Sequence, residues 1–154
     1  MADATIDRLS PNDTETVAHL YNSIFRPERK TEWFDRRIKG RPNPLVQVAR
    51  INHDAVGFYI GLELKPATHF GWLLGVAPDF RRSGIGTQLM RSAMDWARTE
   101  GYSNMRFEVP NAVRHFLHFG IAENFDIVGL RWDNDLHTNL VIFERSLAEP
   151  INPA

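Results

Sequence analysis

Val76–Thr87 has the sequence VAPDFRRSGIGT and joins two segments with different hydrophobic periodicities. The apolar run before it, Phe70–Val76, predicts a buried strand, and the apolar residues spaced along Leu89–Ala97 predict an amphipathic helix. A turn between a strand and a helix directs backbone N–H groups and the positive end of the helix dipole to one place. The stretch therefore predicts a binding site for an anion, above all for phosphate.

The residues inside this turn have properties that suit phosphate. Arg81 and Arg82 supply fixed positive charge that pairs well with phosphate oxygens. Gly84 and Gly86 let the main chain approach a ligand without a Cβ in between, and Thr87 adds a hydroxyl in the first helical turn. The alternative is an ordinary strand-to-helix turn, in which the glycines serve geometry and the arginines serve solubility.

Two familiar phosphate-binding motifs do not fit this turn. No glycine is followed by Lys-Ser or Lys-Thr, which excludes the nucleoside-triphosphate P-loop. The dinucleotide fingerprint requires three glycines and an acidic residue about 20 positions further on, and here the first glycine is missing.

The spacing Arg81-x-x-Gly84-x-Gly86, after a Val-x-Pro strand end and before a helix, resembles motif A of the GNAT superfamily of acetyl-CoA-dependent N-acetyltransferases. In that family the signature Gln/Arg-x-x-Gly-x-Gly/Ala binds the pyrophosphate of coenzyme A. The resemblance extends from about Thr5 to Leu147 and implies acetyl-CoA as the cosubstrate and an amine as the acceptor. It also implies that the pantetheine arm pairs with the backbone of Leu74 and Val76, and that the pyrophosphate is held by Arg81, Arg82, Ser83, Gly84, Ile85, Gly86 and Thr87.

Length and composition favour a single domain over residues 1–154, with a core large enough to fold without disulfides. A hydrophobic content of 43% and a net charge of −1 argue against a disordered chain and against a general nucleic-acid binder. Cysteine is absent, which excludes disulfides, cysteine metal ligands and a cysteine acyl-enzyme. No stretch has the length of a membrane span, so we expect a cytoplasmic protein without membrane partners, and a homodimer stays open. The tail from about Glu149 contains two prolines and is expected to be loose.

The hydrophobic pattern predicts an α/β chain. Strands are expected at 5–9, 45–51, 55–64, in the segment ending at 76, and at 104–109, 125–132 and 137–147. Helices are expected after Ser10 as N-cap with Pro11 in the first position, from Thr31 to about Lys39, from the glycine turn to about Glu100, and from Pro110 onwards. GNAT proteins have the same order, and the resemblance implies an α/β (α+β) fold. Its central sheet is mixed, mostly antiparallel, flanked by helices and splayed between the fourth and fifth strands.

Two glycines, Gly71 and Gly75, interrupt the strand that ends at Val76. A glycine within a strand marks a bulge, a close ligand approach, or packing against a large side chain, for which Trp72 and Trp96 are candidates. The resemblance implies a bulge in this strand and an opening beside it, in which the pantetheine arm lies.

Acetylation of an amine requires a group that accepts the amine proton, and a carboxylate does so directly or through water. Glu108 is our candidate, because it lies on the strand expected to border the splay. The segment Phe107-Glu108-Val109 is similar to a Leu-Glu-Val segment in family members that acetylate ribosomal-protein N-termini, where the glutamate is the base. The alternative is an ion pair between Glu108 and Arg106, on the same strand face. Glu63 and His69 are further candidates.

The general acid is the point at which the sequence departs from the family pattern. Family members often carry Asn-x-x-Ala-x-x-x-Tyr-x-x-x-Gly-Phe on the helix after this strand, with the tyrosine protonating the departing thiolate. If Asn124-Phe125 replaces Gly-Phe, the tyrosine position holds Gly120, and two other alignments place His118 or Phe116 there. No alignment supplies a tyrosine. Either another acid or water acts, or the thiolate leaves unprotonated, or the chain is a catalytically weak acyl-CoA-binding module.

His115 and His118 lie three positions apart on the helix expected after Pro110, but no third ligand accompanies them, so no metal site is predicted. For the acceptor, the resemblance assigns the first two helices and the last strand pair to its site. These elements bring Phe25, Trp33, Phe34, Trp132, Glu32, Asp35, Arg36 and Arg37. Such residues leave the identity of the amine open.

Overall fold

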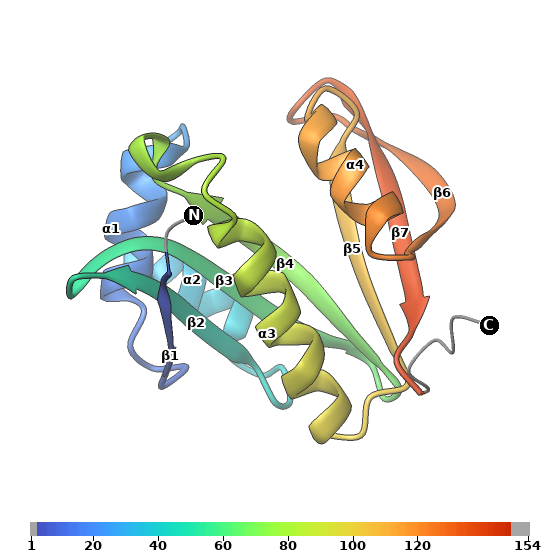
Figure 1. Cartoon of the computed structure of the whole chain (residues 1–154), viewed down its shortest axis with the longest axis horizontal. Coiled ribbons are helices and arrows are strands. Elements are labelled where there is room, and N and C mark those ends of the chain that lie inside the picture. The colour runs from blue at the N-terminus through green and yellow to red at the C-terminus, as the bar shows by residue number, and fades with distance from the viewer. Residues whose placement is uncertain (1–2, 149–154) are drawn as a thin grey trace.

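One sheet of seven strands runs through the computed structural model, which describes residues 3–148 (Figure 1). The strands are β1 (Thr5–Leu9), β2 (Leu45–Ile51), β3 (Asp54–Lys65), β4 (Thr68–Val76), β5 (Asn104–Pro110), β6 (Asp126–Asp133) and β7 (Thr138–Ser146). Their order across the sheet is β1-β2-β3-β4-β5-β7-β6. All neighbours are antiparallel except β4 and β5, which are parallel. This is the mixed, mostly antiparallel sheet that was predicted.

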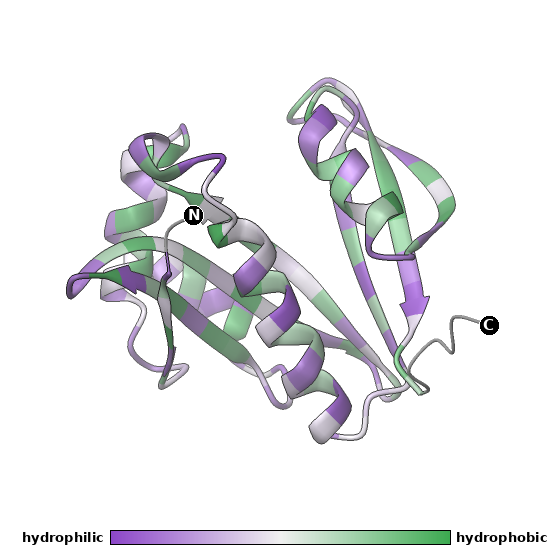
Figure 2. Cartoon of the chain, viewed as in Figure 1, coloured by the Kyte–Doolittle hydropathy of each residue, from purple (hydrophilic) through white to green (hydrophobic). Residues whose placement is uncertain are grey.

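Helices cover both faces of the sheet. On one face, α1 (Glu15–Ile24) and α2 (Thr31–Ile38) pack on β2 and β3 through a core that includes the fully buried Val17, Phe34 and Phe58. On the other face, α3 (Ile85–Thr99) and α4 (Arg114–Ala122) share a second core with β5 and β7. Figure 2 shows hydrophilic residues on the outer side of α3, as expected for an amphipathic helix with its apolar side turned to a sheet.

The splay between β4 and β5 is confirmed. The two strands pair from Thr68 opposite Asn104 to Gly71 opposite Phe107, and no pairing continues beyond this point. Figure 1 shows the strands diverging from there, with β5, β6, β7 and α4 on one side of the fork. One edge of β4 therefore has no strand beside it over the second half of its length.

The starts of two helices differ from the prediction. Ser10 accepts a hydrogen bond from the Asp13 N–H at 2.9 Å, so Ser10–Asp13 form a turn, and α1 begins only at Glu15. Pro110 ends β5 and does not open α4, because Asn111 still donates to the Asn139 carbonyl at 2.9 Å across the sheet. At Ser10 the local signals are used in a turn and not at a helix start, whereas at Pro110 they are outweighed by a hydrogen bond to the neighbouring strand.

The other elements lie within one or two residues of the predicted bounds. Gly101 follows α3 with φ +88°, the left-handed conformation expected of a residue just past a helix. The predicted loose tail lies outside the described residues. Within them, no helix has the length and hydrophobicity needed to cross a membrane.

The outermost strand, β6, keeps several large apolar side chains exposed. Ile127, Leu130 and Trp132 are each more than half exposed, at 57%, 65% and 54%. β6 is also the edge strand of the sheet, so one row of its backbone hydrogen-bonding groups has no partner strand in the described part of the chain. Whether the chain forms a homodimer stays a prediction.

Candidate active site

The glycine turn has the geometry of an anion site. Gly84 is the N-cap of α3 and has φ +84°, a left-handed conformation that glycine adopts without steric cost. The first hydrogen bond of the helix runs from the Gln88 N–H to the Gly84 carbonyl, at 3.0 Å. The N–H groups of Ile85, Gly86 and Thr87 therefore have no acceptor within the helix. No side chain caps this helix end, which leaves these donors available to a ligand.

The predicted phosphate residues contribute in different ways. Arg82 is exposed and has φ +64°, which is uncommon for a residue other than glycine. Arg81 is also exposed, but its Nε donates to the Val76 carbonyl at 3.2 Å. Ser83 Oγ donates to the Phe80 carbonyl. Ile85 is 1% exposed, so only its backbone can meet a ligand. Arg81 and Ser83 thus hold the turn, whereas Arg82 keeps its guanidinium free of protein partners within residues 3–148.

The open edge of β4 carries the backbone groups predicted to bind pantetheine. The Ala77 N–H donates to the Val56 carbonyl on β3 at 2.8 Å. Because successive residues of a strand direct their N–H groups to opposite edges, the N–H groups of Val76 and Leu74 point away from β3. They therefore face the side on which β5 has diverged.

A β-bulge lies where the two strands part. Ile60 of β3 is opposite Leu73, and the next residue, Gly61, is opposite Gly71, so Trp72 has no partner on β3. Trp72 and Leu73 both pack on the α1–α2 side, whereas Leu74 packs on the α3 side. The predicted bulge is present, and it turns two consecutive side chains to the same face.

The glycines of β4 are required by packing. A Cβ at Gly71 would lie 3.0 Å from Tyr59 Oη, and one at Gly75 would lie 2.8 Å from the rings of Phe25 and Phe58. The glycines do pack against large side chains, as one of the predicted alternatives stated. The side chains are those of Tyr59, Phe25 and Phe58, and not those of Trp72 and Trp96.

Glu108 lies on β5, directly after the last residue that pairs with β4. Its side chain points away from the α3–α4 core, because Phe107 and Val109 on either side are buried there. Arg131 of β6 donates to Oε1 of Glu108 from Nη2 at 2.7 Å and from Nε at 3.3 Å. No residue in the described part of the chain donates to Oε2. Glu108 thus retains one oxygen that can accept a proton.

The alternative reading, an ion pair between Glu108 and Arg106, is not present in the structure. Arg106 Nε instead pairs with Glu144 at 3.0 Å, because these two residues lie directly opposite each other on β5 and β7. Arg131 was missed as a partner, since it is 23 positions away and belongs to a strand that reaches β5 only through β7.

Glu63 and His69 do not face the fork. Glu63 Oε1 accepts a hydrogen bond from Tyr102 Oη at 2.8 Å. His69 is fully buried, and its Nε2 lies 2.7 Å from Tyr59 Oη. Burial lowers the pKa of His69 to about 4 and raises the pKa of the Tyr59 hydroxyl. These groups belong to the core beneath α3.

The structure favours one alignment for the missing tyrosine. Asn124 has φ +65°, and the following Phe125 N–H donates to the Gly120 carbonyl at 2.9 Å. This left-handed conformation fits Asn124-Phe125 in place of Gly-Phe, which puts Gly120 in the tyrosine position. A Cβ at Gly120 would lie 2.7 Å from the Phe143 ring, so the position is packed against the core.

The residues predicted near the acceptor lie in three different environments. Phe34 is fully buried, and Phe25 packs beneath Gly75. Trp132 lies on the exposed edge strand. The ring of Trp33 packs on Trp72 at the fork with centroids 5.2 Å apart, and the buried Phe34 meets Trp72 edge-on at 6.4 Å. Trp72 was not predicted for this role, because the bulge was expected in this strand without a defined position.

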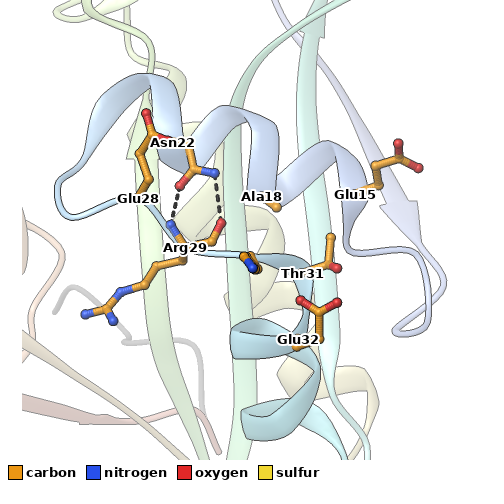
Figure 3. A pocket seen from close by; sticks show the side chains of 8 residues that line it. Glu15, Ala18, Asn22, Glu28, Arg29, Thr31 and Glu32 are labelled. Atoms are coloured by element: carbon orange, nitrogen blue, oxygen red, sulfur yellow. Dashed lines mark hydrogen bonds between the residues drawn. The ribbon is translucent and has the colours of Figure 1, made fainter.

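A pocket of about 520 Å³ lies between α1 and α2 (Figure 3). Its lining includes Glu32, one of the residues predicted near the acceptor, but none of the predicted CoA-binding or catalytic residues. Within it, the Asn22 side chain accepts from the Arg29 N–H at 2.7 Å and donates to the Arg29 carbonyl at 2.8 Å. This pair of hydrogen bonds fixes the loop that leads into α2. We therefore do not assign the reacting centre to this pocket. Its residues position Arg29 and so support the neighbouring site.

His115 and His118 are both exposed on α4. Residues 3–148 contain no group of three metal-ligating side chains close enough to hold an ion.

Comparisons with known proteins agree with this geometry. Residues 14–120, more than half of the chain, match the Acetyltransferase (GNAT) family. The chain therefore belongs to the GNAT acetyltransferase family. No curated protein sequence matches it.

Solved structures share the fold at low sequence identity. The ribosomal-protein-S18-alanine N-acetyltransferase of Escherichia coli has a TM-score of 0.82 at 17% identity, over 99% of each chain. Ard1 from Thermoplasma volcanium has a TM-score of 0.78 at 23% identity, over 95% of this chain and 99% of that one. YncA from Salmonella typhimurium, solved with its cofactor acetyl-CoA, has a TM-score of 0.73 at 17% identity over 99% of each chain.

Proposed function

We propose that this protein transfers an acetyl group from acetyl-CoA to a primary amine. The observation that carries the proposal is the continuity of the open edge of β4 with the start of α3. The edge presents backbone groups of Leu74 and Val76, and the helix presents the N–H groups of Ile85 to Thr87. An extended arm with amide groups that ends in a pyrophosphate is complementary to this series of donors. The acetyl-CoA bound to the structural neighbour YncA supports the same ligand here.

The chemical step follows from the position of Glu108. The nitrogen lone pair of a neutral amine attacks the thioester carbonyl carbon, and the C–S bond breaks as the tetrahedral intermediate collapses. The nitrogen loses a proton to Oε2 of Glu108, directly or through a water molecule, and coenzyme A leaves as its thiolate. A positioned carboxylate base contributes about 10²–10⁴ to such a rate.

The leaving group requires no dedicated acid in this proposal. A thiol has a pKa near 8.5, so its thiolate is a tolerable leaving group in water. The alternative is a catalytically weak acyl-CoA-binding module, which two observations favour: Gly120 stands in the tyrosine position, and Arg131 occupies one oxygen of Glu108. Both functions include CoA binding, so only turnover of acetyl-CoA with a broad panel of amines separates them.

CoA binding itself is tested at Gly84. Gly84→Asp places a negative side chain against the pyrophosphate, so calorimetry should show a large loss of CoA affinity. Gly101→Asp is the matched control, because Gly101 flanks the other end of α3 with nearly the same φ and has open space around it. Undiminished CoA binding by folded Gly84→Asp would contradict the assignment, as would an equal loss in both variants.

A further inference from the structure

Four side chains form a stack beside the fork. The guanidinium of Arg29 lies 4.7 Å from the ring centroid of Trp33, and the guanidinium of Arg37 lies 5.3 Å from the ring centroid of Trp72. Between them, the Trp33 and Trp72 rings have centroids 5.2 Å apart and are tilted by 35°. Trp33 and Arg37 are four residues apart on α2 and therefore share one helix face. Trp72 is the bulge residue of β4. The stack thus connects α2 to the point where β4 and β5 part.

Stacking orients Arg37 without using its hydrogen-bond donors. A guanidinium lying on an aromatic ring keeps its N–H groups at its rim, where they match a carboxylate in pairs. Within residues 3–148, Arg37 has no carboxylate oxygen within 4.0 Å, whereas Arg131 pairs with Glu108 and Arg106 pairs with Glu144. Arg37 is therefore an oriented cation without an ion-pair partner in the described chain.

The charges around Arg37 make this position favourable for an anion. Burial lowers the pKa of Arg37, and the nearby charges of Arg41 and Arg131 lower it further, while Glu108 raises it. Arginine nevertheless stays charged near neutral pH. The Arg37 side chain is exposed at the surface, and an added negative group would offset the two positive charges beside it.

Resting on the proposed function, we propose that the acceptor amine carries a carboxylate, which Arg37 binds while the amine lies at Oε2 of Glu108. Arg37 lies over Trp72, the residue that follows the last paired residue of β4, and Glu108 is the residue that follows the last paired residue of β5. Both groups therefore lie at the base of the fork, where one small molecule can meet them. The positive Arg37 is complementary to a carboxylate, and the negative Glu108 is complementary to an amine. A free amino acid presents these two groups close together. The half-buried ring of Trp72 lies beside Arg37 and offers apolar contact to the remainder of the acceptor.

The first test compares acceptors that differ only in the carboxylate. Free amino acids and the corresponding amino-acid amides are each assayed with acetyl-CoA. We expect a preference for the amino acids in kcat/KM, even though the amide's amine is more often neutral near pH 7. Arg37→Gln should lower kcat/KM for the amino acids about 10- to 100-fold, the range of a lost charge-assisted hydrogen bond, and leave the amides unaffected. Arg37→Lys should fall between the two, because it keeps the charge but not the planar fork.

The matched control is Arg8→Gln. Arg8 also lies over a tryptophan, at 6.0 Å from the ring of Trp96, but it belongs to β1 and has no relation to the fork. It should change neither acceptor preference nor CoA affinity. Calorimetry of an amino acid with the CoA-saturated protein provides a second readout, and its binding should depend on Arg37 while the affinity for CoA does not.

The outcomes separate this inference from the proposed function. Acetylation of amines without a preference for the carboxylate overturns the inference and leaves the function standing. The same holds if folded Arg37→Gln loses activity equally toward amino acids and amides. Failure to acetylate any amine overturns both.

Discussion

Arg131 donates both of its hydrogen bonds to the same oxygen of Glu108, at 2.7 Å from Nη2 and 3.3 Å from Nε. The hydrogen bond to Glu108 is the largest cause of a raised pKa of Arg131. The arrangement fixes the orientation of the carboxylate while its Oε2 has no donor in the described part of the chain. In the proposed role as a base, a carboxylate that is held on one side and available on the other can act repeatedly without being reoriented.

Replacing Glu108 tests this role directly. Glu108→Gln keeps the shape of the side chain but removes the proton acceptor, so turnover with an accepted amine should fall about 100-fold or more. CoA affinity should not change, because Glu108 lies outside the glycine turn. Steady-state kinetics over a range of pH, with calorimetry for CoA, measure both. Unchanged turnover across that range would assign Glu108 to the ion pair alone.

Arg82 should contribute to CoA binding through its free guanidinium. Arg82→Ala removes a charge-assisted contact with the pyrophosphate and should weaken CoA binding by roughly 1–3 kcal/mol. The loss should shrink as salt rises, because exposed charges are screened. Calorimetry at low and high ionic strength measures it, and an Arg8→Ala variant serves as the control. Equal CoA affinity in the wild type and in Arg82→Ala would remove Arg82 from the site.

No tyrosine should act as the general acid. Tyr21, Tyr59 and Tyr102 are at most 8% exposed, and Tyr59 and Tyr102 hydrogen-bond to His69 and Glu63. Each Tyr→Phe variant should keep turnover within a few-fold of the wild type, while loss of the hydrogen bond at Tyr59 or Tyr102 should lower the free energy of unfolding by about 1 kcal/mol. Denaturant titration and kinetics together measure this. A large fall in turnover with CoA affinity retained, in any one variant, would identify that tyrosine as the acid.

The buried His69 should make stability depend on pH. Its pKa is about 4 in the folded protein and 6.5 in a free side chain, because burial disfavours the charged ring. As pH falls below 6.5, the unfolded chain takes up a proton that the folded protein refuses, so stability is lost until pH 4 is reached. Between pH 7 and pH 5, His69 should therefore lower the free energy of unfolding by about 2 kcal/mol.

Urea titrations of the wild type and of His69→Gln at pH 7 and pH 5 measure that difference. Carboxylates titrate in both proteins, so only the difference between their pH dependences reports on His69. The exposed His115→Gln provides the control. Identical pH dependences in wild type and His69→Gln would contradict the prediction.

Local signals account for what the sequence predicted well. The turn from Val76 to Thr87 and the left-handed Gly101 are each determined by neighbouring residues, and both have the predicted form. The alternation along β5 correctly separated Phe107 from Glu108, because a half-buried strand has a period of two.

Contacts between distant segments account for what it did not predict. The pairing of Glu108 with Arg131 depends on how β7 aligns β6 with β5, and no short-range pattern encodes that register. The stack of Trp33 on Trp72 likewise joins a helix to a strand 39 positions later, at a bulge whose position in the strand was not specified. The late start of α1 was not predicted, because Ser10 and Pro11 suit a turn as well as they suit the start of a helix.

The pairing of the sheet does not depend on the bulge at Trp72, whereas the proposed binding of the acceptor does. Gly71 and Leu73 are opposite adjacent residues of β3, so a chain without Trp72 would keep the same pairing in a regular strand. It would lose the bend that accompanies a bulge and the ring that joins Arg37 to the fork. Trp72 can therefore be regarded as an insertion into a sheet that is complete without it. The proposed acceptor site could therefore be gained or lost by a single codon while the sheet keeps the same architecture.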